Sequence, residues 1–396
     1  MLLHSDPGWV QLWGSDPRPW LLASGNAVAR FLAIDALDAG DGLDVQRRDP
    51  PDAIDAGSEA NEAAPASIAA SRREDARVAA LASDDIQRLL GSLATWTEPM
   101  PAGHDRPGYL PNQLSWLADL GVRGGDDDRV EEALDALAVH QDDNGRFLAY
   151  GSAPGMAGPL WHSMPCDTHL VVDVLVRYGR AGHPATKRGL GRIAADLCDT
   201  PVGPCWTCRP DPQVGWRGPG RRGDLCPQVS LEAVRAWSRL PADEQPDNLV
   251  EVAASLVRVW LARETSRPYA FGHGIGFKTV KWPPLWYGVL AVLDTLGRVP
   301  QVWASSGPLR RGVAELVACL LAYNVGEDVA VTPRSVYRGF TGCCYGQKRT
   351  ASPIATARLA AVVVPFSSLA EEVAAVDVHR LASAKGGTGT PRPPRG

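Results

Sequence analysis

Four cysteines of this chain have a spacing that suits a metal site. Cys205 and Cys208 form a Cys-x-x-Cys turn in the stretch GPCWTCRPDPQVGWRGPGRRGDLCPQ, and Cys226 follows near the end of that stretch. Cys166 begins another apolar segment further towards the N-terminus, in MPCDTHL. Thiolates from one such turn and from one or two distant positions suit tetrahedral zinc or an iron–sulfur cluster. We therefore expect Cys166, Cys205, Cys208 and Cys226 to converge on one metal ion.

Other interpretations of the cysteines stay open. Three thiolates with an open position would form a catalytic site, four would form a structural one, and Asp167 could replace Cys166 as a ligand. The Cys-x-x-Cys pair could instead be a redox-active dithiol. Buried cysteines are also common as small apolar residues, so the thiols could simply be free.

A glycine- and arginine-rich turn follows the cysteine pair. In GWRGPGRRGD, Arg217 and Arg221 alternate with glycines, so backbone N–H groups and guanidinium forks could hold a diphosphate. The alternative is a tight solvent-facing turn packed by Trp216. The sequence leaves both possibilities open.

Aromatic and titratable side chains gather in the same kind of segment. Aromatic faces can bind an apolar chain or stabilise a cation, and they can equally fill gaps between loops. The candidate substrate-binding residues are Arg217, Arg221 and the aromatic residues Trp161, Trp286, Tyr287 and Tyr337. The candidate catalytic residues are Asp167, His162 and His273, which could act as acid, base or ligand.

Composition limits the class of protein. The chain has 396 residues, a net charge of −5 and a pI near 5.9, so no basic surface indicates a nucleic acid partner. The N-terminus lacks the basic and apolar regions of a signal peptide, and no apolar run reaches the ~18 residues of a membrane span. We expect a soluble cytoplasmic protein, in which clustered cysteines indicate metal or catalysis rather than disulfides.

The elements that position these residues repeat along the chain. Helices are expected to end near 116–121, 174–179, 236–241 and 292–297, each followed after a short turn by a second helix. Loops of about 25 residues then lead to prolines, which the first turn of a helix tolerates. Long loops collected on one face predict an all-α fold, an (α/α) toroid of about five to six helix hairpins.

The pattern also divides the chain into segments. Residues 1–44 are expected to be an N-terminal helical segment, with one short amphipathic helix in WLLASGNAVARFLAIDAL. Residues 45–75 contain no aromatic residue and predict a disordered, non-helical linker. The toroid is expected over 76–384, with a disordered tail over 385–396.

Several motifs resemble the terpenoid cyclase and protein prenyltransferase superfamily. QDDNGRF (141–147) is similar to the Gln-x-x-x-Gly-x-Trp repeat of terpene cyclases, with Phe147 in place of the tryptophan. The stretch GWRGPGRRGDLCPQVSLEAVRAWSRLP resembles the glycine-rich turn and inner helix of prenyltransferase β subunits. PLWHSMPCDTHLVVDVLVRYG and RPYAFGHGIGFKTVKWPPLWYGVLAVLD resemble a bacterial and archaeal squalene-cyclase-like family. The resemblance covers most of 80–365.

The resemblance implies a toroid and favours zinc, because the metal sites known in that superfamily hold zinc. It does not supply a reaction: the Asp-x-Asp-Asp acid of class II cyclases is absent from the sequence. We expect a metal-supported enzyme acting on an isoprenoid-like or other elongated apolar substrate. The alternative is a non-catalytic toroid that binds a ligand or peptide and carries a structural zinc.

Overall fold

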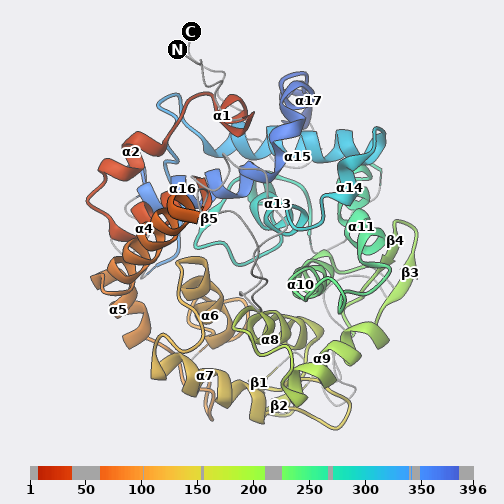
Figure 1. Cartoon of the computed structure of the whole chain (residues 1–396). Helices are drawn as coiled ribbons and strands as arrows, with labels where there is room; N and C mark the ends of the chain where they lie inside the picture. The colour runs from red at the N-terminus through yellow and green to blue at the C-terminus, as the bar shows by residue number, and fades with distance from the viewer. Residues whose placement is uncertain are drawn as a thin grey trace.

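The fold is an all-α toroid, in which an inner ring of helices is enclosed by an outer one (Figure 1). The computed structural model describes residues 8–37, 63–100, 102–152, 156–209, 225–265, 271–338, 340 and 348–382. The helices of the inner ring are α3 (Ala27–Leu32), α6 (Leu110–Asp119), α8 (Pro165–Arg177), α10 (Pro227–Trp237), α13 (Val289–Leu296) and α16 (Pro353–Val363). The toroid predicted from the repeat is confirmed.

Contacts between neighbouring helices close the inner ring. Helix α6 packs on α8, α8 on α10, α10 on α13, α13 on α16, and α16 on α3. The remaining gap is closed where the ring of Phe31, from α3, lies against Gly121 at the end of α6. A Cβ on Gly121 would lie 2.2 Å from that ring, and its φ is +99°, so glycine is required there.

The outer layer follows the predicted second helix of each hairpin. Its main helices are α4 (Ala63–Leu81), α5 (Asp84–Gly91), α7 (Asp128–Val139), α9 (Pro184–Ala195), α11 (Leu249–Leu261) and α15 (Pro308–Asn324). Shorter pieces are α1 (Gly8–Trp13), α2 (Arg18–Ala23), η1 (Ala33–Leu37), α12 (Ile275–Lys278), α14 (Gln301–Ala304), η4 (Val364–Leu369), α17 (Ala370–Ala374) and η5 (Arg380–Ala382). Apolar side chains at helical spacing fill the space between the two layers.

Short strands occur in the long loops at the N-terminal ends of the inner helices. Antiparallel pairs are β1 (Ala149–Gly151) with β2 (Leu160–His162), and β3 (Cys198–Thr200) with β4 (Gly203–Cys205); β5 (Lys281–Trp282) and β6 (Ser335–Val336) are parallel. This end of the ring, where the long loops collect, is called the mouth below. The opposite end, at the short turns, is called the base.

The motif QDDNGRF makes one of the connections within the repeat. Gln141 Nε2 donates to the carbonyl oxygens of Gly145 (3.1 Å) and Ala185 (2.8 Å), which ties the turn to the start of α9. Phe147 is fully buried beside α9. The role of this motif is therefore structural.

The N-terminal part of the chain differs from the expectation. WLLASGNAVARFLAIDAL is not one helix, because the chain breaks at Ser24–Asn26 and Asn26 Oδ1 caps α3 by accepting from Ala29 N (2.9 Å). These helices belong to the ring: α1 packs on α16, η4 and α17, so the two ends of the described chain meet (Figure 1).

The predicted linker is also partly wrong. Helix α4 begins at Ala63, so residues 63–75 are helical, while 38–62 and the tail from 383 lie outside the described residues. The segment lacks aromatic residues but is rich in alanine, which has the highest helix propensity. The same helix packs against α3, although residues 68–72 are exposed.

One inner helix starts later in the structure than the sequence indicates. The helix expected to open at WPPLWYG begins at Val289, because Trp282 belongs to the strand β5.

Among the described residues, Pro353–Ala374 alone is long and apolar enough to cross a membrane, and 56% of that window is buried inside the protein. It contains an inner helix of the ring, so core packing explains its composition.

Candidate metal centre

Three potential metal ligands meet at the mouth of the toroid. One ligand atom from each of His104, Cys166 and Asp167 lies within 4.8 Å of the other two. His104 comes from the loop before α6, whereas Cys166 and Asp167 lie in the first turn of α8. In the part of the chain that the structure describes, this is the one group of three or more His, Cys, Asp or Glu residues so close together.

Asp167 is held by several donors. Its Oδ1 accepts from the Tyr109 hydroxyl at 2.8 Å and lies 3.3 Å from His104 Nδ1, and its Oδ2 accepts from Met164 N at 3.1 Å. Burial alone would raise the pKa of this carboxyl, but the donors, with His104 foremost, hold it below its usual value. Asp167 is therefore a carboxylate, although its side chain is only 3% exposed.

Cys166 and His104 influence each other's ionisation. Burial raises the pKa of the Cys166 thiol to about 12, and the facing His104 opposes this shift. The pKa of His104 is raised, first by the charge that Cys166 carries when ionised and then by the hydrogen bond to Asp167. The first turn of α8 also favours negative charge on both of its residues. A cation bound here would make the thiolate the stable form of Cys166.

A further acidic residue lies in the next inner helix. Glu232, in α10, is 2% exposed, and burial raises its pKa to about 8. Its Oε1 accepts from Gln228 Nε2 at 2.6 Å, while its Oε2 has no hydrogen-bond partner among the described residues. The charge of Glu232 contributes to the raised pKa values of Cys166 and Tyr109, so Glu232 lies near the mouth cluster.

The donor set of the cluster fits zinc. Imidazole nitrogen, thiolate sulfur and carboxylate oxygen are all common zinc ligands. Ligands of a tetrahedral zinc lie about 3.3–3.8 Å apart, so side chains already within 4.8 Å need only small movements. The Tyr109 hydroxyl, which orients Asp167, provides the outer-shell support typical of such sites.

The predicted four-cysteine site is not formed. Cys166 belongs to the cluster with His104, but the Cys205 thiol lies among the hydroxyls of Ser230, Ser255 and Thr200. Its backbone is held in β4, where the Cys205 carbonyl accepts from the Cys198 thiol at 3.3 Å. The expectation that Cys205, Cys208 and Cys226 share one ion is therefore wrong in its geometry.

Local strand geometry explains why the pair separates. Thr207 bridges Leu225 in antiparallel fashion, and side chains alternate between faces along an extended segment. The Cys208 thiol contacts Cys226 instead, and this contact, with burial, raises the pKa of Cys226 well above its usual value. Cys208 and Cys226 are thus a thiol pair apart from the cluster.

The two predicted catalytic histidines lie in different places. His162, at the end of β2, is buried with Nδ1 3.1 Å from the Leu160 carbonyl oxygen. His273 is 2% exposed and lies with Nε2 3.0 Å from the Tyr287 hydroxyl. Neither belongs to the metal cluster, although Asp167 does.

Three of the predicted aromatic residues line one cavity. Trp286, Tyr287 and Tyr337 border a cavity of about 140 Å³, with Pro284 and Phe277 among the other lining residues. One face of Tyr337 is covered by Lys281, whose Nζ lies 3.6 Å from the ring centroid.

Trp161 is not among the residues that line this cavity. It stacks on His140 with ring centroids 3.8 Å apart and donates to Glu98. Arg217 and Arg221 lie outside the described residues, so their prediction stays a prediction.

Ring contacts connect this cavity with the metal cluster. His104 packs edge-on against Trp286 at 5.7 Å, and Phe271 contacts both Trp286 (6.4 Å) and Tyr287 (6.1 Å). Tyr287 in turn contacts His273 at 5.8 Å. A row of aromatic rings therefore leads from the cluster along the cavity wall.

Sequence reasoning missed His104, Tyr109 and Glu232. The first two lie in HDRPGYLP, where nothing in the spacing points to α8. Glu232 had a usable signal, because it lies among the apolar residues of the predicted inner helix QVSLEAVRAW. A charged residue on an inner helix is costly unless it has a role.

Comparison with known proteins gives little more. No family model matches the chain, and no curated protein matches it. A solved structure of the GH76 α-mannanase BT2949 from Bacteroides thetaiotaomicron, as its selenomethionine derivative, is similar at 9% identity and a TM-score of 0.41. The match covers 92% of this chain and 87% of that one. At that distance the similarity carries no information on function.

Proposed function

We propose that the chain is a zinc-supported enzyme that acts on an isoprenoid-like or other elongated apolar substrate at the mouth of the toroid. The ligands would be His104, Cys166 and Asp167. The convergence of these three side chains is the observation that carries the proposal. Zinc bound there would act as a Lewis acid or would hold a reactive oxygen or sulfur nucleophile in its ionised form.

The number of ligands favours catalysis over the structural alternative. Structural zinc sites have four protein ligands, whereas catalytic sites use three and leave one position open. Among the residues that the structure describes, the cluster offers three. Glu232 supports the same interpretation, because a pKa of about 8 allows it to hold and release a proton near neutral pH.

The other residues of the mouth would bind and orient the substrate. The row of rings from His104 through Trp286 and Phe271 to Tyr287 offers an apolar surface that begins at the cluster. Tyr109 would keep Asp167 in place. This arrangement suits a substrate that is long, apolar and reactive at one end.

The first experiment measures zinc. Protein stripped with a chelator and refilled with zinc is expected to hold about one ion per chain, and Cys166→Ser is expected to lose it. Cys208→Ser is the matched control, since it removes a thiol outside the cluster and should leave the zinc content unchanged. Zinc lost equally from both variants, or absent from the wild type, would contradict the proposed ligands.

The second experiment tests catalysis separately. Zinc-loaded protein is incubated with isoprenoid alcohols and diphosphates of increasing length, and products are followed by mass spectrometry. We expect conversion that Glu232→Gln reduces by about 10²–10⁴-fold. Stoichiometric zinc without any conversion would favour the ligand-binding alternative.

A further inference from the structure

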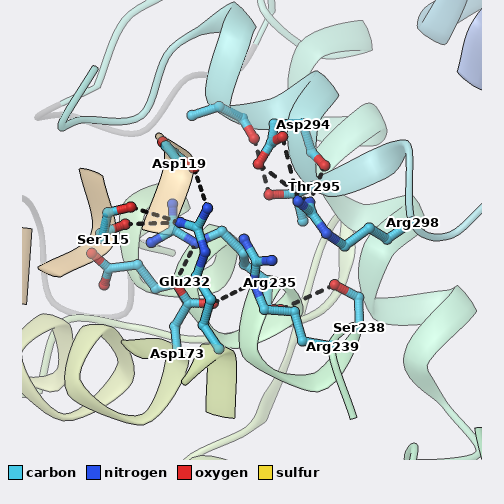
Figure 2. A network of polar contacts seen from close by, with 12 residues as sticks. Ser115, Asp119, Asp173, Glu232, Arg235, Ser238, Arg239, Asp294, Thr295 and Arg298 are labelled. Atoms are coloured by element: carbon cyan, nitrogen blue, oxygen red, sulfur yellow. Dashed lines mark hydrogen bonds and ion pairs between the residues drawn. The ribbon is translucent and has the colours of Figure 1, made fainter. Parts of the chain in front are cut away.

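A ring of charged side chains crosses the base of the toroid, far along the inner helices from the metal cluster. Figure 2 shows this network. We call it the arginine belt, and its members are Arg177, Arg235, Arg239, Arg298, Arg358, Asp119, Asp173 and Asp294. They come from α6, α8, α10, α13 and α16, with Arg239 just after α10 and Arg298 just after α13.

The acids of the belt are shared between the arginines. Asp119 accepts from Arg177 and from Arg358, the latter at 2.8 Å. Asp173 accepts from Arg235 Nε at 2.8 Å and from Arg239 Nε at 3.0 Å.

Asp294 is shared in the same way. It pairs with Arg298 and Arg358, both at 3.2 Å. Five guanidinium groups thus share three carboxylates in these contacts, and at Asp173 two guanidinium groups share one.

Glu232 does not remove this excess. It lies next to the belt in Figure 2, but its hydrogen bond goes to Gln228, and burial raises its pKa to about 8. Even when Glu232 is ionised, the guanidinium groups outnumber the carboxylates by one. The side chains of Asp173, Arg235 and Arg239 are 0%, 16% and 14% exposed, so water offers limited compensation.

Donor groups remain available at one point of the belt. Arg235 and Arg239 each use Nε for Asp173, and no residue that the structure describes accepts a hydrogen bond from their Nη atoms. Both side chains keep a small exposure to solvent, 16% for Arg235 and 14% for Arg239. Two guanidinium groups bonded to one carboxylate thus keep their Nη donors without an acceptor among the described residues.

The electrostatics favour an anion at this point. A guanidinium group has the highest pKa of the protein side chains, so it favours the charged form more strongly than lysine or histidine does. Burial and the charge of Arg298 lower the pKa of Arg239 well below its usual value, which reflects the unfavourable surroundings. A multivalent oxyanion would compensate the charge and would accept from the planar forks.

We propose that the arginine belt binds a phosphate group through the Nη atoms of Arg235 and Arg239. Phosphate carries up to two negative charges at neutral pH, and Arg235 and Arg239 together carry one positive charge more than Asp173 balances. The site lies at the base and does not depend on the proposed zinc enzyme. The phosphate can be inorganic, or it can be part of a small phosphate ester.

Equilibrium dialysis of the full chain with radiolabelled inorganic phosphate tests the proposal. We expect about one phosphate per chain, with a dissociation constant of ~1 mM or below, competition by sulfate and none by chloride. Glycerol phosphate as a second competitor distinguishes the two sources: displacement by it at similar concentration indicates that the site accepts phosphate esters. Absence of saturable binding at about ten times that concentration overturns the proposal.

Variants locate the site. Arg235→Gln with Arg239→Gln is expected to weaken phosphate binding more than about 10-fold. Arg258→Gln is the matched control, because Arg258 pairs with Glu251 on the outer helix α11 and should leave binding unchanged. Binding that is unaffected by the double substitution overturns the assignment to these residues. If the double variant does not fold, Arg239→Lys, which keeps the charge and loses the fork, provides the comparison.

Discussion

Replacing Tyr109 by phenylalanine tests how the mouth cluster is held together. The substitution removes one hydroxyl, which is buried and donates to Asp167 Oδ1 at 2.8 Å. Burial raises the pKa of Tyr109 well above its usual value, so this hydroxyl keeps its proton and always donates. A hydrogen bond to a charged group contributes about 1.5–3 kcal/mol, and we expect a loss of stability in that range.

Tyr178→Phe is a matched control for this experiment. Tyr178 is also buried in the inner ring, and its hydroxyl donates at 2.8 Å, but to the neutral carbonyl of Leu114. We expect a smaller loss, of about 0.5–1.5 kcal/mol. Urea unfolding of the zinc-free proteins measures both values.

The pH dependence of the two losses should differ. The folded pKa of Asp167 is below its unfolded value, so its contribution is complete above the unfolded pKa and is lost as the pH falls through the folded pKa. Without the Tyr109 hydroxyl the folded pKa rises. The destabilisation by Tyr109→Phe should therefore be largest near neutral pH and shrink below about pH 4, whereas that of Tyr178→Phe should stay constant.

Zinc affinity provides the decisive measurement. Loss of an outer-shell partner typically lowers metal affinity about 10–100-fold, which a competition titration with a chelator resolves. Tyr178→Phe should leave the affinity unchanged. Equal zinc affinities in the two variants, together with equal, pH-independent losses of stability, would refute the role assigned to Tyr109.

Three further substitutions have defined expectations. The pKa of Glu232 is raised in the folded protein, so its contribution to stability is complete below its unfolded pKa and is lost as the pH rises towards 8. Between pH 5 and 8 the free energy of unfolding, measured by urea titration, should therefore fall by about 2–4 kcal/mol less in Glu232→Gln than in the wild type. Asp173→Asn leaves two arginines without their carboxylate and should cost about 3–5 kcal/mol, against about 0.5 kcal/mol or less for the exposed Asp135→Asn. Gly145→Ala should lower stability by about 1–3 kcal/mol, since φ is +82° and the new Cβ would lie 2.5 Å from the Arg188 carbonyl oxygen, while Gly191→Ala has open space and should be neutral or stabilising.

The hairpin helices were predictable because each satisfies local rules on its own. Apolar spacing identified α7, α9, α11 and α15, and prolines in the first turn marked the starts of α8, α10 and α16. The sequence failed where a tertiary contact decided the outcome. The alanine-rich start of α4 resembles a linker, and the contacts of that helix with α3 are not visible in its sequence.

The metal cluster was only half predictable for a similar reason. Cys166 and Asp167 could be identified because they open an inner helix, and the ends of inner helices face the mouth. His104 comes from a loop whose path depends on the ring being closed, and no sequence rule places it beside α8. Cys205 and Cys208 were misassigned because Cys-x-x-Cys spacing shows closeness in sequence but not the direction of each thiol. An extended backbone at Trp206–Thr207 turns the two sulfurs apart.

The arginine belt shows how a repeat can reveal a site that single motifs do not. Asp119, Arg177, Arg235 and Asp294 recur at intervals of about 58 residues, and a toroid built from such repeats brings equivalent positions to one level of the ring. A charge at one such position could be incidental, but charges at four equivalent positions must face one another. The signs of these charges then decide whether positive and negative charge cancel around the ring. At these four positions two arginines meet two aspartates, so the excess of positive charge at the base comes from Arg239, Arg298 and Arg358, which are joined there by Asp173 alone.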